Sequence, residues 1–173
     1  MPSQITHGEL FAGIGGFALG AELVGIKTLW SVEIDKFCNR VLDLRFPETR
    51  RYTDIREVSG YELAPVDVIS AGSPCQDLSI AGRRPGLEGE RSGLFMEFIR
   101  ILKEMRNATN GAFPRFAVWE NATGALSLNK GWDFDAVLTA FHDAACVELA
   151  YRVTNAEKHG VPQRRRRIIL VTR

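Results

Sequence analysis

The chain has 173 residues, of which 45% are hydrophobic and 25% charged, and its formal net charge is +1. This composition predicts one soluble globular domain with a sizeable core, and the near-neutral charge argues against a protein that coats nucleic acid nonspecifically. The three cysteines form no close pair, which argues against a disulfide framework or a zinc site. Because the sequence has no signal peptide and no run long enough to span a membrane, we expect a cytoplasmic protein. The cysteine spacing leads us to expect no bound metal.

Short apolar runs alternate with amphipathic segments along the chain. The spacing of apolar residues predicts helices over residues 17–24, 36–46, 94–105 and 134–145. Apolar and β-branched runs predict strands over residues 9–12, 28–32, 51–55, 66–72, 116–119, 147–154 and 167–172. This alternation predicts a doubly wound, mostly parallel α/β sheet with an antiparallel pair at one edge.

A glycine-rich turn follows the first predicted strand. Residues 13–18, Gly-Ile-Gly-Gly-Phe-Ala, match the pattern G-x-G-x-x-G/A, which lets the backbone approach a ligand at a helix N-terminus. About twenty residues later, Glu33 ends the second predicted strand, where its carboxylate can accept hydrogen bonds from ribose hydroxyls. The pattern predicts an adenosine-containing cofactor, but it does not distinguish a nicotinamide cofactor from another one.

Cys75 lies just beyond the predicted strand 66–72, in the sequence Ser-Pro-Cys-Gln. Parallel sheets place reactive groups beyond the carboxyl ends of their strands, and Pro74 cannot continue the ladder. A lone cysteine is more commonly a small buried core residue. Polar neighbours and the Gly/Arg/Glu-rich residues 82–93 favour instead a cysteine that faces a solvated loop, so Cys75 is a candidate for chemistry.

Further polar groups occur at strand ends on the same side of the predicted sheet. Glu120 follows the strand 116–119; a lone carboxylate there is commonly a helix cap, but this one shares a sheet edge with Cys75. Residues 163–167, Gln-Arg-Arg-Arg-Arg, come before the last strand, and a solvated basic run is the simplest interpretation. Alternate strand residues share a face, which predicts that Arg165 and Arg167 point together.

These motifs, in this order, resemble those of the cytosine-5 DNA methyltransferase family over essentially all 173 residues. The resemblance implies the Rossmann-like fold of S-adenosylmethionine-dependent methyltransferases, with S-adenosylmethionine as cofactor and DNA as partner, as in restriction–modification enzymes. By this resemblance Glu33 holds the ribose, Asp54 and Ile55 contact the adenine, and Leu94 helps to close the pocket. The residues implied to bind the cofactor are Phe11, Gly13, Ile14, Gly15, Glu33, Asp54, Ile55 and Leu94.

The resemblance also implies a covalent mechanism. The Cys75 thiolate would add to C6 of a cytosine flipped out of the duplex, so that C5 can attack the methyl group. An ordinary thiol is only about 3% thiolate at pH 7. Glu120 would hold or protonate N3, and Arg167, with Arg165 in second place, would bind near O2 and the phosphates. The residues implied to contact DNA are Gln76, Ser79, Arg83, Arg84 and Gln163.

The family continues beyond these motifs into a target-recognition domain and a final closing helix, which we do not find in the sequence. Residues 1–173 are therefore expected to form a catalytic and cofactor-binding domain with little activity alone, either a subunit whose partner reads DNA or a truncated product. Ala122 stands where the family usually has valine. The alternatives are an RNA-directed enzyme that methylates cytosine in transfer RNA and a non-catalytic remnant. A nicotinamide dehydrogenase would leave Cys75 and the arginine run without a role.

Overall fold

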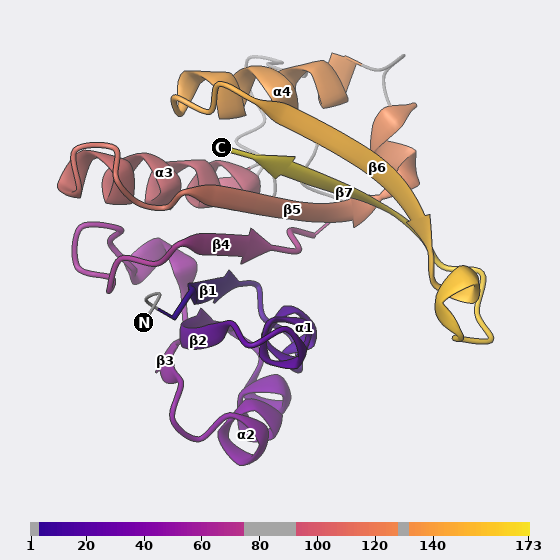
Figure 1. The fold of residues 1–173 in the computed structure, drawn as a ribbon, viewed down its shortest axis with the longest axis horizontal. Coiled ribbons are helices and arrows are strands. Elements are labelled where there is room, and N and C mark those ends of the chain that lie inside the picture. Colours follow the sequence, from indigo (N-terminus) through magenta and orange to yellow (C-terminus); the bar gives the residue numbers. More distant parts are fainter. Residues whose placement is uncertain (1–3, 75–92, 128–131) are drawn as a thin grey trace, which may run out of the picture.

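The strands of the sheet lie in the order β3-β2-β1-β4-β5-β7-β6 in the computed structural model, which describes residues 4–74, 93–127 and 132–173 (Figure 1). Strands β1 to β5 are mutually parallel, whereas β7 runs antiparallel to both of its neighbours. The predicted doubly wound sheet with an antiparallel edge is therefore confirmed. The strands are β1 (Thr6–Leu10), β2 (Lys27–Val32), β3 (Arg50–Tyr52), β4 (Val68–Ala71), β5 (Phe116–Ala122), β6 (Leu149–Asn155) and β7 (Arg166–Thr172).

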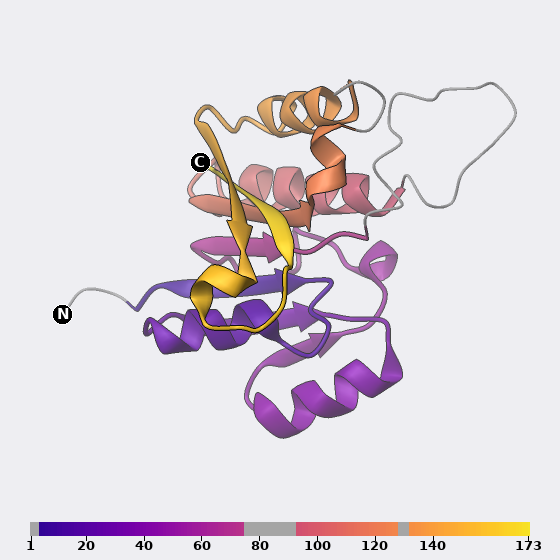
Figure 2. The same ribbon diagram turned by 90° about the vertical axis from the view of Figure 1, so that its right-hand side faces the viewer.

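Helices pack against both faces of the sheet (Figures 1 and 2). The crossovers between parallel strands are right-handed, so the direction in which the chain moves along the sheet decides which face a helix covers. Helices α1 and α2 cover one face, because the chain there moves from β1 toward β3. The later helices cover the other face, because the chain then moves toward β5. Side-chain alternation in β5 agrees with this arrangement: Val118 lies beside α1, and Trp119 contacts Phe95 of α3. The helices are α1 (Gly16–Leu23), α2 (Lys36–Arg45), α3 (Gly93–Ala108) and α4 (Trp132–Asp143), with 3₁₀ turns η1 (Ile55–Glu57), η3 (Thr123–Leu126) and η5 (Ala156–His159).

The core lies mainly between the sheet and α3 with α4. The apolar stripe predicted for the third helix is buried, including Phe98, Ile101 and Met105. Phe95 makes edge-to-face contacts with Trp119 and with Phe141 of α4, at centroid distances of 5.8 and 5.9 Å. Such pairs contribute about 0.5–1.5 kcal/mol each beyond the apolar area they bury. This layer holds β4, β5 and α3 in fixed relative positions.

Strands β1, β5 and β3 each have one end that lies three residues from its predicted position. Strand β1 begins at Thr6 and not at residue 9, because polar His7 is buried with partners: its ring nitrogens lie 2.9 Å from Thr28 Oγ1 and 2.7 Å from Ser70 Oγ. Strand β5 continues through Glu120 to Ala122, since β7 pairs with it over that length. Strand β3 ends early, at Tyr52.

The two directions of winding meet at β1, which pairs with β2 on one side and with β4 on the other. Ligand sites of open α/β sheets lie at this reversal, just outside the carboxyl ends of the strands. Among the described residues, no helix is both long and apolar enough to cross a membrane.

Candidate active site

A cavity of about 490 Å³ opens at the carboxyl ends of β1 to β4. Its volume is in the range of small-molecule sites, and its wall combines apolar side chains with a few convergent polar groups. Phe11 follows β1 and is a non-glycine residue in the left-handed region, with φ of 55°. Strain of this kind concentrates at ligand sites. The residues lining the cavity are Phe11, Gly13, Val32, Glu33, Ile34, Thr53, Asp54, Ile55, Arg56, Gly72, Pro74 and Leu94.

The Glu33 carboxylate is fixed by the backbone around it. Glu33 Oε2 accepts a hydrogen bond from Gly13 N at 2.6 Å, and Oε1 accepts one from Asp35 N at 2.8 Å. A Cβ atom on Gly13, whose φ is 55°, would meet no neighbouring atom within 4 Å, so the turn leaves open space beside this carboxylate. Each carboxylate oxygen can accept more than one hydrogen bond. Glu33 is therefore oriented, with acceptor capacity remaining for hydroxyl groups.

A second carboxylate, Glu9, is buried in β1 below the glycine turn. Its Oε1 accepts a hydrogen bond from Phe17 N at 3.1 Å, and its Oε2 has no hydrogen-bond partner. Burial raises the pKa of Glu9 from 4.5 to about 7, although hydrogen bonds from the backbone of Phe17 and Ala18 oppose the shift. Glu9 supports the N-terminus of α1 and does not line the cavity.

Glu9→Gln is expected to change how stability depends on pH. Because the folded state raises the Glu9 pKa, the stability contributed by its protonated form is fully present below pH 4.5 and is lost as the pH rises through about 7. A shift of this size corresponds to about 3 kcal/mol. Denaturant unfolding at pH 5 and pH 8 should show that the free energy of unfolding of Glu9→Gln increases relative to that of the wild type as the pH rises.

The difference in unfolding free energy between the wild type and Glu9→Gln reports the titration of Glu9 alone. Burial lowers the pKa of His7 to about 4, but His7 titrates equally in both proteins and its effect cancels. If the unfolding free energies of the wild type and the variant change in parallel with pH, the raised pKa of Glu9 is contradicted.

Glu120 and two arginines of the last strand form a second polar cluster. Arg167 Nε lies 2.8 Å from Glu120 Oε1, and Arg165 Nη2 lies 3.8 Å from the same oxygen. Arg164, which lies before β7, is instead 3.6 Å from Glu157. The three side chains of the cluster are between 23% and 49% exposed, so the cluster is open to solvent and to a ligand.

Gly72 separates this cluster from the cavity. It lines the cavity, and a Cβ atom at this position would lie 3.3 Å from Glu120 Oε2. A larger residue would press on the carboxylate. The absence of a side chain at Gly72 therefore keeps Glu120 next to the cavity wall.

The turn that leads to Cys75 is anchored by β5. Trp119 Nε1 donates a hydrogen bond to Ser73 Oγ at 2.9 Å, and Asn121 Nδ2 donates one to the Ser73 carbonyl at 3.1 Å. All three side chains are buried. Glu120 lies between Trp119 and Asn121, on the opposite face of the strand. Strand β5 therefore positions both the Glu120 carboxylate and Ser73, at the start of the turn that leads to Cys75.

The structure brings most of the predicted site residues to one sheet edge. Six of the residues predicted to bind the cofactor line the cavity, but Ile14 and Gly15 do not: Ile14 is 60% exposed, and a Cβ on Gly15 would lie 2.5 Å from the Phe46 ring. Gly15 therefore serves the packing of α1 on α2. Gln163 is exposed, before β7. The predicted residues Cys75, Gln76, Ser79, Arg83 and Arg84 lie outside the described residues.

Sequence reasoning missed several residues of the site. Val32, Ile34, Thr53 and Pro74 line the cavity because each lies at or just beyond the end of a strand, a rule that would have identified them. The hydrogen bonds of Trp119 and Asn121 to Ser73 gave no such signal, because Ser73 is more than forty residues away. Within the described part of the chain, no cluster of His, Cys, Asp and Glu could hold a metal ion.

Solved structures share this fold. A putative DNA modification methyltransferase of E. coli, encoded within a prophage, matches 98% of the chain with a TM-score of 0.77 and 22% identity, over 46% of its own length. The S. pombe Dnmt2 methyltransferase matches 98% of the chain with a TM-score of 0.75 and 19% identity, over 51% of its own length. The chain therefore has the same fold as these two methyltransferases.

Sequence comparison is more specific. The profile of the family described as C-5 cytosine-specific DNA methylase matches residues 5–173, and the chain therefore belongs to this family. It is 37% identical to the type II methyltransferase M2.BsuMI of Bacillus subtilis, over 94% of this chain and 40% of the relative. It is 33% identical to M.HhaI of Haemophilus parahaemolyticus, over 94% and 47%. It is 31% identical to M.AquIA of Picosynechococcus, over 94% and 69%.

The family uses S-adenosylmethionine as its cofactor, and the described residues fit such a molecule. The cavity has the volume of a small-molecule site, the open turn at Gly13 presents backbone to it, and Glu33 offers acceptors for ribose hydroxyls. Ile55 and Leu94 contribute apolar surface to the cavity wall, which suits a flat base. The chain spans about two fifths to one half of the length of the curated relatives it matches first.

Proposed function

We propose that this chain catalyses the transfer of a methyl group from S-adenosylmethionine to C5 of cytosine in DNA. The observation that carries the proposal is the convergence of three features at one sheet edge. These are the cofactor-sized cavity, the Glu120 carboxylate held by Arg165 and Arg167, and the anchored turn that leads to Cys75. Membership of the cytosine-specific family supports the same reaction.

Each polar residue then has a distinct task. S-adenosylmethionine supplies an electrophilic methyl group. Cys75 acts as the nucleophile toward C6 of the cytosine, which gives C5 the electron density to accept the methyl group; loss of the C5 proton and elimination of the Cys75 thiolate from C6 then restore the base and the enzyme. Glu120 holds N3 and can supply a proton there, and Arg167 offers a planar donor group to O2, with Arg165 beside it. Since a cytosine inside a duplex cannot reach this edge, the base is flipped out before it reacts.

Cofactor binding gives a direct test of the proposal. Calorimetry should show that the chain binds S-adenosylhomocysteine in preference to NAD. Glu33→Ala is expected to weaken this binding by about 1.5–3 kcal/mol, the range for hydrogen bonds to a charged group. Glu62→Ala removes an exposed carboxylate outside the cavity and should leave the affinity unchanged. Tighter binding of NAD would refute the methyltransferase assignment.

DNA recognition requires more than the cluster at this edge. Base-specific contacts supply about 1–3 kcal/mol of discrimination each, and flipping a base costs a few kcal/mol. We propose that a target-recognition domain and a closing helix, carried by a second subunit or a further segment, supply the missing binding energy. Support comes from the sheet face beside α1, where Val118 lines an apolar hollow and Phe116 and Val171 are more than one third exposed.

Purified residues 1–173 are accordingly expected to transfer little methyl group to DNA. The measurement is the incorporation of tritiated methyl into duplex DNA, with RNA as a parallel substrate. Addition of a chain that carries the recognition domain and the closing helix should restore incorporation. Robust, sequence-specific methylation by residues 1–173 alone would contradict this expectation, and preference for RNA would favour the RNA-directed alternative.

A further inference from the structure

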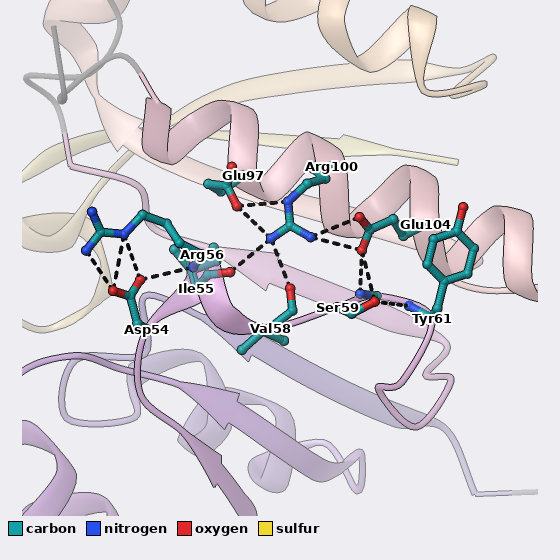
Figure 3. Close-up of polar contacts among 10 residues, drawn as sticks. Asp54, Ile55, Arg56, Val58, Ser59, Tyr61, Glu97, Arg100 and Glu104 are labelled. Carbon is teal, nitrogen blue, oxygen red and sulfur yellow. Dashed lines mark hydrogen bonds and ion pairs between the residues drawn. The ribbon is translucent and has the colours of Figure 1, made fainter.

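Arg100 of α3 connects that helix to the segment that follows β3 (Figure 3). Its Nη2 donates hydrogen bonds to the carbonyl oxygens of Ile55 at 3.0 Å and Val58 at 2.9 Å. These two carbonyls belong to the turn η1 and to its C-terminal cap. One guanidinium therefore holds both ends of η1 against α3.

Two carboxylates of the same helix hold the guanidinium in turn. Arg100 Nη2 lies 2.6 Å from Glu97 Oε2, and Nη1 lies 2.9 Å from Glu104 Oε2, at the helical spacings i,i+3 and i,i+4. The Arg100 side chain is 31% exposed, and both carboxylates are less exposed. Burial alone would lower the pKa of Arg100, but the hydrogen bonds and ion pairs with Glu97 and Glu104 outweigh it and raise this pKa.

Glu104 and Gly60 extend the contact beyond η1. Glu104 Oε2 accepts a hydrogen bond from Gly60 N at 2.6 Å. A Cβ atom on Gly60 would lie 2.5 Å from the Ile101 carbonyl oxygen, so only glycine allows the chain to approach the helix this closely. The segment from Ile55 to Gly60 is thus docked on α3 at both of its ends.

The docked segment and the helix form two walls of the cavity. Asp54, Ile55 and Arg56 line it from the side of η1, and Leu94 lines it from the first turn of α3. No atom of Arg100, Glu97 or Glu104 is among the lining residues. These three residues, called the Arg100 cluster below, can therefore affect a bound ligand only through the position of the two walls.

We propose that Arg100 is a positioning residue for the cofactor, which sets the gap between Ile55 and Leu94 that receives the adenine. This inference rests on the proposed function, since it assumes that the cavity binds S-adenosylmethionine. A planar guanidinium with several donors can serve two carbonyls and two carboxylates at once, which a lysine ammonium or an apolar side chain cannot do. Without Arg100, the two carbonyls lose their partner and η1 is no longer tied to α3.

The test combines calorimetry with hydrogen exchange on the wild type and Arg100→Met. We expect the dissociation constant for S-adenosylhomocysteine to rise at least tenfold, at a temperature where circular dichroism shows the variant folded. Backbone amides of residues 55–60 should exchange faster, whereas those of β6 and β7 should not change. Arg115→Met is the matched control: Arg115 pairs with Asp67 at 3.3 Å, neither residue lines the cavity, and affinity should stay within twofold.

The outcomes separate this inference from the function on which it rests. A wild-type chain that does not bind S-adenosylhomocysteine would refute the proposed function, and the inference with it. A wild type that binds, together with an Arg100→Met variant within twofold of it, would refute the inference alone. Faster exchange throughout the chain would also refute it, because the loss would then be one of global stability. If Arg100→Met does not fold, Glu97→Gln decides: at least threefold weaker binding supports the role, and a smaller change refutes it.

Discussion

Glu120→Gln is expected to lower kcat for methyl transfer by about 10²- to 10⁴-fold, the usual effect of losing a positioned acid or base. Glutamine keeps the size of the side chain, but it cannot give a proton to N3 and carries no charge opposite Arg167. The ion pair that the substitution neutralises is short, since Glu120 Oε1 and Arg167 Nε are 2.8 Å apart. The measurement is single-turnover methyl transfer in the complete, DNA-binding enzyme at saturating cofactor.

A control variant separates the effect of losing Glu120 at the site from the effect of losing any ion pair of this kind. Glu148→Gln removes an equally short pair, since Glu148 Oε1 accepts a hydrogen bond from Arg173 Nη2 at 2.8 Å. That pair lies at the opposite edge of the sheet, away from the cavity, and its loss should leave kcat unchanged. S-adenosylhomocysteine should bind Glu120→Gln as well as the wild type. A variant that keeps its full rate would exclude Glu120 from the chemical step.

Local patterns predicted the sheet well wherever one face is apolar. The second strand, the β6–β7 pair and all four helices were predicted to within a few residues, because hydrophobic periodicity reports burial directly. The start of β1 was missed because His7 is polar and yet buried. Its partners, Thr28 and Ser70, come from other strands, and no window of local sequence contains them. A rule based on local sequence cannot predict the burial of a polar residue whose hydrogen-bond partners are distant in sequence.

The same reason explains two differences between the sequence-based expectations and the structure near the site. Glu120 was placed after a strand, because a charged residue rarely continues one; the structure keeps it inside β5, where Arg167 of the neighbouring strand lies beside it. Gly15 matched a ligand-binding pattern, but the neighbour that requires glycine there is Phe46, thirty-one residues later. Motif spacing pointed to one edge of the sheet. It could not assign each residue to a ligand or to packing.

The Arg100 cluster shows a further limit of motif reasoning. The apolar stripe of α3 predicted a core helix, which is confirmed, and its charged residues carried no separate signal. Glu97 and Glu104 look from the sequence like ordinary partners of a solvated helix face. Only the docked segment after β3, brought close by Gly60, shows that this face holds a wall of the cavity.

Cys75→Ser is expected to abolish methyl transfer. A serine hydroxyl is not ionised at neutral pH and is a much weaker nucleophile than a thiolate, so C6 of the cytosine would not be attacked. The hydrogen bonds that hold the preceding Ser73 come from Trp119 and Asn121 and do not involve the thiol. Folding and S-adenosylhomocysteine binding should therefore be preserved while turnover is lost.

Cys38→Ser provides the control, because Cys38 is half-buried on α2 outside the cavity. Burial and a hydrogen bond with Asp35 raise the pKa of Cys38, which leaves it mostly as the unreactive thiol at neutral pH. The assay is methyl transfer to duplex DNA in the complete enzyme, with mass spectrometry for a covalent protein–DNA adduct. We expect the adduct with the wild type and with Cys38→Ser, and none with Cys75→Ser. Turnover retained by Cys75→Ser would exclude this residue as the nucleophile, and the search would pass to the remaining polar groups at the ends of β4 and β5.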